Sequence, residues 1–323
     1  MIIYYMIYTI IDSISNVMVM EMRMKTTSKR SFRIKRETFV GYAFLFPSII
    51  GFSVFVVYPL LSSVYYALTR WNGASPPKFI GFRNFQYMFT LDPAFWPSLK
   101  ATAIFVALSV PSSLALGLAF AILLNRQMPG VKLLRTVFYL PVVLPSIASL
   151  TLWKFIFNPQ YGFANEILKS LGLPTSLWLG STRMAIPAIV IIGLWGVGGT
   201  MIIFLAGLQA VPEELYEAAR LDGAGSWSVF IRITLPMISP ILFLQLVMQI
   251  IGSMQAFNQP AVLTGGGPGF TTDLFMYNIW QNAFQNEQFG YAVSQVWVLF
   301  ILIMILTAIV FRFSTMWVYA ENE

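Results

Sequence analysis

The stretch YAVSQVWVLFILIMILTAIVFRF, residues 291–313, contains a single charged residue, Arg312, close to its C-terminal end. A helix that crosses a bilayer needs about 20 mostly apolar residues, and this stretch supplies them. Its apolar residues do not alternate with polar ones as they would in a strand of a membrane barrel. Because lipid offers backbone polar groups no water, the stretch predicts a membrane-spanning helix.

Five further stretches of the same kind precede it, at residues 40–68, 99–124, 137–157, 185–208 and 237–257. The chain of 323 residues is 57% hydrophobic and only 10% charged, whereas a soluble domain carries about 25% charged residues. The sequence therefore predicts an all-α, polytopic membrane protein with six transmembrane helices.

Several classes of function are disfavoured by residues that the sequence lacks. Cysteine and histidine are absent, which removes thiolate metal sites and His-based acid–base catalysis. No GxxxxGK[ST] phosphate loop is found, so the chain is not expected to bind ATP through one of its own. The spans lack central Asp or Glu residues for a proton relay, and Lys154 is expected to snorkel to the interface. We therefore predict no enzyme activity, no cofactor and no metal. If the chain moves a solute uphill, we expect the energy to come from another chain.

Lysine and arginine residues predict the orientation. They are concentrated before the first span, at residues 23–36, and after the second, at residues 126–135. Such segments are normally cytoplasmic, so both termini are predicted to lie inside the cell. The expected organisation is a tail at 1–38, a transmembrane domain at 39–314 and a second tail at 315–323. Five basic residues depart from the bias by lying in predicted outer loops: Arg70, Lys78, Arg83, Lys169 and Arg183.

Residues 1–20 are apolar but are interrupted by Asp12, and no basic residue precedes them. They lack the basic start and cleavage site of a secretory signal. The preferred interpretation is an over-long translation start, and the alternative is an additional span.

The loop between the fourth and fifth spans, QAVPEELYEAARLDGAGSWSVFIRITLP at residues 209–236, has the pattern of two short helices. Leu215, Ala218 and Leu221 recur at helical spacing and predict one apolar face. Gly223 and Gly225 are expected to end this first helix.

The second helix is expected to be capped by Ser226 and to end before Leu235, which precedes a proline. The product is a helix-turn-helix elbow on the cytoplasmic side. An ordinary amphipathic interfacial loop is the alternative interpretation.

The same loop resembles a known family. Glu217-Ala218-Ala219, Gly223 and Ile233-Thr234-Leu235-Pro236 fit the EAA loop of ABC importer permeases at full spacing. In that family the loop docks into a cytoplasmic ATPase. The resemblance implies a type I permease fold and an ATPase-coupling role for six residues: Glu217, Ala218, Ala219, Gly223, Leu235 and Pro236.

Three other stretches are similar to the maltose and glycerol-phosphate branch of the family: residues 79–85, residues 158–165 and residues 263–269. The resemblance implies a bacterial or archaeal plasma-membrane importer of a sugar. Its expected partners are a second homologous permease, an ATPase dimer, an extracytoplasmic solute-binding protein and membrane lipid, with no nucleic acid.

A sugar pathway needs hydrogen-bonding side chains, and Gln249, Gln255 and Asn258 in and after the fifth span are the candidates. Polar amides also hold helix bundles together, which is the alternative role. Because the spans carry no central basic residue, a neutral saccharide is favoured over glycerol phosphate or another polar solute. A secondary transporter acting alone is the remaining alternative.

Overall fold

The computed structural model describes residues 36–126 and 128–318. The predictions for residues 1–20, for the basic residues 23–35 and for the end of the C-terminal tail at 319–323 lie outside these ranges. The chain forms two compact units, Met1–Pro59 and Leu60–Glu323, and each is described by itself.

The described part of the first unit is one helical run. It comprises α2 (Arg36–Phe52), the π-helical turn η1 (Ser53–Val57) and the start of α3 (Tyr58–Ala67), which continues into the second unit. The run Phe39–Ala67 is long and apolar enough to cross a membrane.

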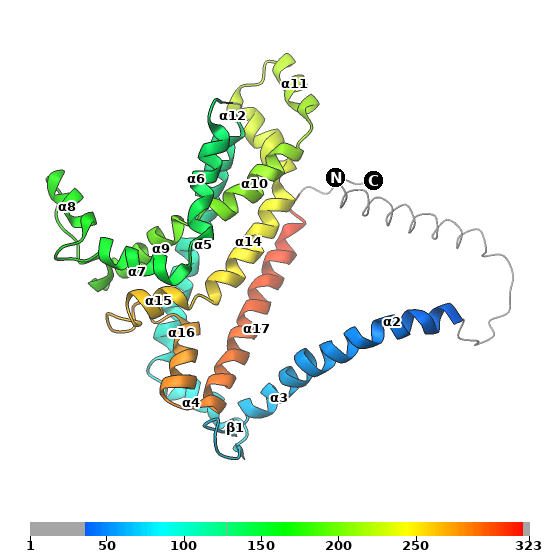
Figure 1. Ribbon diagram of the computed structural model, residues 1–323, viewed down its shortest axis with the longest axis vertical. Helices are drawn as coiled ribbons and strands as arrows, with labels where there is room; N and C mark the ends of the chain where they lie inside the picture. Colours follow the sequence, from blue (N-terminus) through cyan, green and yellow to red (C-terminus); the bar gives the residue numbers. More distant parts are fainter. Residues whose placement is uncertain (1–35, 127, 319–323) are drawn as a thin grey trace. The chain divides into compact units, whose positions relative to one another are not determined.

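The second unit is built around two long, unbroken helices, α5 (Phe95–Asn125) and α17 (Phe289–Ser314). Helix α5 packs against α9 (Ala185–Leu194), α10 (Gly198–Ala210) and α14 (Ser239–Met254), and α14 also packs against α17 (Figure 1). A Cβ at Gly117 on α5 would lie 2.8 Å from Cγ2 of Thr200 on α10. Small residues at such contacts let membrane helices approach closely.

Two of the predicted spans are bent within their length, and a third bend joins the elbow to the fifth span. Helix α6 (Val131–Val143) meets α7 (Ser146–Ile156) at 97°, α9 meets α10 at 51°, and the run Ser226–Met237 meets α14 at 66°. Counting each bent pair as one span gives six within the described ranges, and the predicted all-helical membrane fold is confirmed. At the sharpest bend, Pro145 has no N–H to donate and Leu144 is extended, with ψ 144°.

The cytoplasmic elbow predicted at 209–236 lies at one end of the long helices. Its elements are α11 (Glu213–Leu221), α12 (Ser226–Val229), the π-helical turn η3 (Phe230–Thr234) and α13 (Leu235–Met237). Figure 1 shows α11 and α12 at the end of the second unit opposite to β1 and α4.

The opposite end is formed by short elements: β1 (Thr69–Arg70), β2 (Lys78–Phe79), α4 (Arg83–Thr90), α16 (Phe275–Trp280) and the π-helical turn η4 (Gln281–Gln285). The two strands form an antiparallel hairpin in which Arg70 is directly opposite Lys78. The remaining short helices are α8 (Phe163–Ser170), η2 (Trp178–Gly180) and α15 (Asn258–Leu263).

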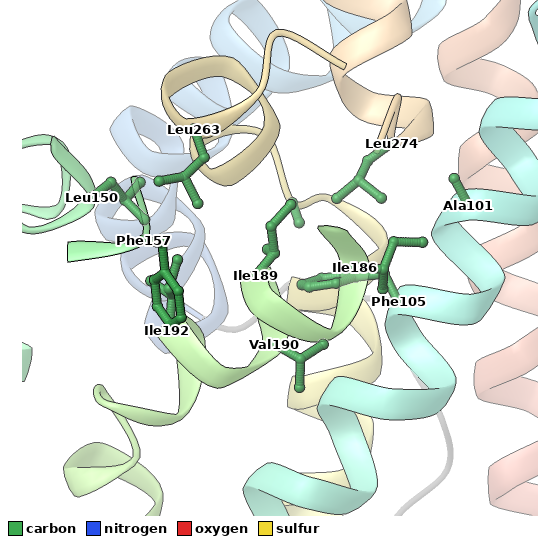
Figure 2. Close-up of a cluster of buried hydrophobic side chains, with 11 residues drawn as sticks. Ala101, Phe105, Leu150, Phe157, Ile186, Ile189, Val190, Ile192, Leu263 and Leu274 are labelled. Atoms are coloured by element: carbon green, nitrogen blue, oxygen red, sulfur yellow. The ribbon is translucent and has the colours of Figure 1, made fainter. Parts of the chain in front are cut away.

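Apolar side chains from α5, α7, α9 and α15 form a buried cluster where the broken spans meet (Figure 2). Phe105, Ile189 and Val190 belong to this cluster and also line a neighbouring polar cavity. The cluster therefore fixes the apolar wall of that cavity.

Candidate functional site: the elbow and the polar cavity

The first elbow helix, α11, presents most of its surface outward. Glu213 and Glu214 lie in its first turn, where the helix dipole favours negative charge. Glu217 and Ala218 are exposed, and Ala219 is the buried residue of the helix. Its small side chain lets the backbone of α11 lie close to the rest of the chain.

The predicted apolar face of α11 is not a buried face. Leu215 is exposed, Ala218 is exposed and Leu221 is 89% exposed. The side turned inward carries Ala219 and the half-buried Tyr216 instead. The exposed leucines are thus available to another molecule.

Helix α11 ends in a Schellman motif. Gly223 has φ +73°, its N–H donates to the Arg220 carbonyl at 3.1 Å, and the Ala224 N–H donates to the Ala219 carbonyl at 2.9 Å. This pair of hydrogen bonds satisfies carbonyls at the helix end and needs a residue that tolerates positive φ. The prediction that Gly223 ends the helix is confirmed.

The second half of the elbow differs from its prediction in two ways. Gly225, not Ser226, occupies the N-cap position, and no side chain caps the helix. The helix does not end before Leu235 but continues through η3 and α13 to Met237. The π-helical turn widens the backbone immediately before Pro236, which is how a helix accommodates a proline ring. Leu235 and Pro236 therefore lie at the bend into α14.

A contact between hydroxyl groups closes the elbow. The Tyr216 hydroxyl on α11 lies 3.3 Å from Oγ1 of Thr234, which ends η3 and is buried. Because η3 leads through α13 into α14, this contact joins α11 to the start of a membrane helix.

A polar cavity of 330 Å³ lies between α5, α9 and α14. Its hydrogen-bonding side chains are Ser109, Ser113, Gln245, Gln249, Ser253 and Gln259. No charged side chain lines it in the described part of the chain. The arrangement suits a neutral polar solute better than an ion.

Gln249 is the most connected of the lining residues. Its Nε2 donates to Oγ1 of Thr200 at 2.8 Å and to Oγ of Ser113 at 3.1 Å. Gln249 therefore both lines the cavity and joins three helices.

Gln255 and Asn258 lie outside the lining of this cavity, and both are exposed. Nδ2 of Asn258 contacts Oγ of Ser146 at the start of α7, at 3.5 Å. Sequence reasoning missed Ser109 and Ser113. Their four-residue spacing within an otherwise apolar helix, which places them on one face, was the available signal.

Lys154 near the end of α7 also has a specific partner. Its Nζ donates to the Val262 carbonyl on α15 at 3.1 Å. The side chain is exposed, as expected for snorkelling, but its position is set by this contact between helices.

Bent spans around an uncharged polar cavity, with an exposed helical elbow at one end, are the parts of a solute permease that is driven from outside its own chain. Residues 113–320 match the family described as "Binding-protein-dependent transport system inner membrane component". The chain belongs to that family, which makes it a multi-pass inner-membrane transport component, and the family prediction is confirmed.

Named relatives agree with this assignment. The chain is 37% identical over 299 residues to "Probable ABC transporter permease protein YesP" of Bacillus subtilis, covering 91% of this chain and 96% of the relative. It is 38% identical over 248 residues to the trehalose/maltose transport system permease protein MalF of Thermococcus litoralis, covering 76% and 83%.

A solved structure shares the fold. A bacterial ABC transporter involved in the import of the acidic polysaccharide alginate superposes with a TM-score of 0.76 at 25% identity, covering 87% of this chain and 96% of that chain. The long helices and the bent spans therefore belong to a known permease architecture.

Proposed function

We propose that this chain is one of two permease subunits of an ATP-driven importer for a sugar or oligosaccharide. Its partners would be a similar second permease, a cytoplasmic ATPase dimer and an extracytoplasmic solute-binding protein. The relative named for trehalose and maltose and the alginate importer support a saccharide cargo. The observation that carries the proposal is the exposed, rigidly terminated helix α11 joined through Tyr216 and Thr234 to α14.

The coupling step follows from that connection. Glu217 and Ala218 are exposed and would contact the ATPase, while Ala219 and Gly223 hold α11 in place and end it. Leu235 and Pro236 lie at the bend through which movement of the elbow would reach α14. Closure of the ATPase dimer would then rock the bent spans about the cavity, as in alternating access.

The orientation belongs to the same proposal. The elbow and both termini would lie in the cytoplasm, and the β1–β2 hairpin with α4 would lie on the outer side. The basic residues Lys132 and Arg135 near the start of α6 support this orientation. The transmembrane domain is proposed to extend over residues 39–314.

The cargo pathway is proposed to pass Gln249 and to continue past Gln255 and Asn258. Gln249 lines the polar cavity, and Gln259, next to Asn258 on α15, lines it as well. Amides and hydroxyls can each donate and accept hydrogen bonds, as sugar hydroxyls require. The lack of charged lining residues in the described chain favours a neutral saccharide over a phosphorylated solute.

Reconstitution tests the proposal directly. Proteoliposomes containing the chain, its second permease and its ATPase should hydrolyse ATP faster when loaded binding protein is added. Ala218→Arg should abolish this stimulation without unfolding the chain, because Ala218 is exposed. Transport by the isolated chain, without ATP or ATPase, would instead identify a secondary transporter.

A further inference from the structure

A second cavity, of 850 Å³, lies at the end of the second unit opposite to the elbow. It is bounded by the β1–β2 hairpin, by α4 and by the first turn of α17, which lie together at this end in Figure 1. Its charged lining residues are Arg70, Lys78, Arg83 and Glu287. Three cations thus face one carboxylate around a single space.

Each of the three cations is in a locally unfavourable position. Arg70 and Lys78 are directly opposed across the antiparallel hairpin, and like charges so placed destabilise a strand pair. Arg83 is the first residue of α4, where the helix dipole disfavours a positive charge. Within residues 36–126 and 128–318, none of the three forms an ion pair. The described side chains that line this cavity therefore carry a net positive charge, three cations against one carboxylate.

The ends of two candidate spans indicate that the cavity lies where lipid headgroups would begin. Arg70 follows shortly after Ala67, the last residue of the first candidate span, and Tyr291 lies in the first turn of the α17 span. The headgroup region begins where the apolar part of a span ends. Trp71 and Tyr87 also line the cavity, and such side chains are enriched at the membrane–water interface.

Exposed apolar rings flank the same hairpin. Phe79 is 66% exposed and Phe82 is 74% exposed. Phe79 is the last residue of β2, and Phe82 immediately precedes α4. Rings at this depth can contact the glycerol and upper acyl region of a lipid whose phosphate enters the cavity.

We propose that this cavity binds the phosphate group of an anionic phospholipid. Guanidinium groups donate paired hydrogen bonds to phosphate oxygens, and an ammonium group adds a compact charge. Glu287 is held at φ +54° and offsets only part of the positive charge. The site also accounts for Arg70, Lys78 and Arg83, three of the basic residues that depart from the predicted charge bias.

The lipid would come from the leaflet of the membrane that is remote from the ATPase. This choice of leaflet rests on the orientation given in the proposed function. The binding itself does not depend on that orientation. A test of lipid binding to the full-length chain therefore separates the two proposals.

Native mass spectrometry of the full-length chain in neutral detergent measures the binding. Phosphatidylglycerol should bind in preference to phosphatidylcholine, and Arg70→Gln with Lys78→Gln should weaken it about thirtyfold. The matched control is Lys169→Gln with Arg183→Gln, which removes the same charge from basic residues outside this cavity and should leave the affinity unchanged. Equal weakening by both pairs would show diffuse attraction and overturn the site.

Two further experiments test whether the site depends on charge and whether its ligand is a lipid or free phosphate. The exchange pair Arg70→Lys with Lys78→Arg retains both charges and should retain binding; its failure to bind would contradict a charge-based site. Inorganic phosphate is titrated in the absence of lipid. If it saturates the site with the same dependence on Arg70 and Lys78 and abolishes the preference for phosphatidylglycerol, the ligand is a free phosphate and the lipid assignment is wrong.

Discussion

Gly198 on α10 lies against the backbone of Phe138 on α6, so closely that a Cβ at Gly198 would overlap the Phe138 carbonyl oxygen. This contact joins two bent spans, the α6–α7 pair and the α9–α10 pair. A neighbouring glycine, Gly199, has no such constraint, because its Cβ would lie 3.9 Å from the side chain of Val142. The closest backbone approach of α6 to α10 among these two glycines is therefore at Gly198.

Replacing each of these two glycines by alanine separates two effects on stability: the loss of close helix packing and the gain in helix propensity. Gly198→Ala should destabilise the chain by about 1–3 kcal/mol, because α6 and α10 must move apart. Gly199→Ala adds the same methyl group in ordinary contact and should be neutral or stabilising by up to about 1 kcal/mol. Thermal unfolding in detergent measures both. Equal midpoints for the two variants would contradict the close contact at Gly198.

Gly223 should be needed because its backbone has a positive φ, and not because a side chain at this position would collide with a neighbour. No atom lies within 4 Å of a Cβ built there, but its φ is +73°. Gly223→Val should therefore disrupt the end of α11, since a β-branched residue rarely adopts positive φ. Gly223→Asn should be tolerated, because asparagine accepts this conformation.

The readout is ATP hydrolysis stimulated by the binding protein, with ATPase retention on the purified permease as a second measurement. The Val variant should lose both, and the Asn variant should keep most of each. Equal activity of Val and Asn variants would show that the Schellman end is not required for coupling.

Asp273, in the loop before α16, should make stability depend on pH. The side chain is 3% exposed, and burial raises the pKa of this carboxyl to about 6, helped by the charge of Asp92 and opposed by a hydrogen bond from Asn278. Between its ordinary value and pH 6 the folded chain holds a proton that the unfolded chain has lost. The stability from this group is thus present at low pH and falls as pH rises through about 6.

Asp273→Asn removes this ionisation. Its thermal midpoint should exceed that of the unmodified chain most at pH 7.5, and the difference should shrink as the pH is lowered to 5. Asp222→Asn, at an exposed position, is the control for the loss of one carboxylate. A pH-independent difference for Asp273→Asn would rule out the buried ionisation.

Features set by local chemistry were predictable from the sequence. The apolar spans follow from run length, and the end of α11 follows from a glycine at the required position. The bend at Pro145 was foreseeable in kind, but its 97° angle depends on how α7 packs. The bend between α9 and α10 has no proline and lies in a glycine-rich stretch. Its position could therefore not be predicted from residue type alone.

Features that join distant segments were not predictable. Gln249 meets Thr200 and Ser113 only because α5, α10 and α14 converge. Two motif asparagines have similar long-range roles. Nδ2 of Asn84 donates to the Ala67 and Thr69 carbonyls at 2.8 and 2.9 Å, and Asn165 bridges to Ser176 and Trp178. The resemblance marked these positions, but the tertiary fold explains them.

Helix α11 is proposed to face the cytoplasm and to be held there by an ATPase. The sequence contains no cysteine, so Glu217→Cys introduces a single thiol on the exposed side of α11. A membrane-impermeant maleimide should label it in inside-out vesicles but not in right-side-out ones, and assembly with the ATPase should protect it. Labelling from the outside, or labelling that the ATPase does not change, would contradict the account.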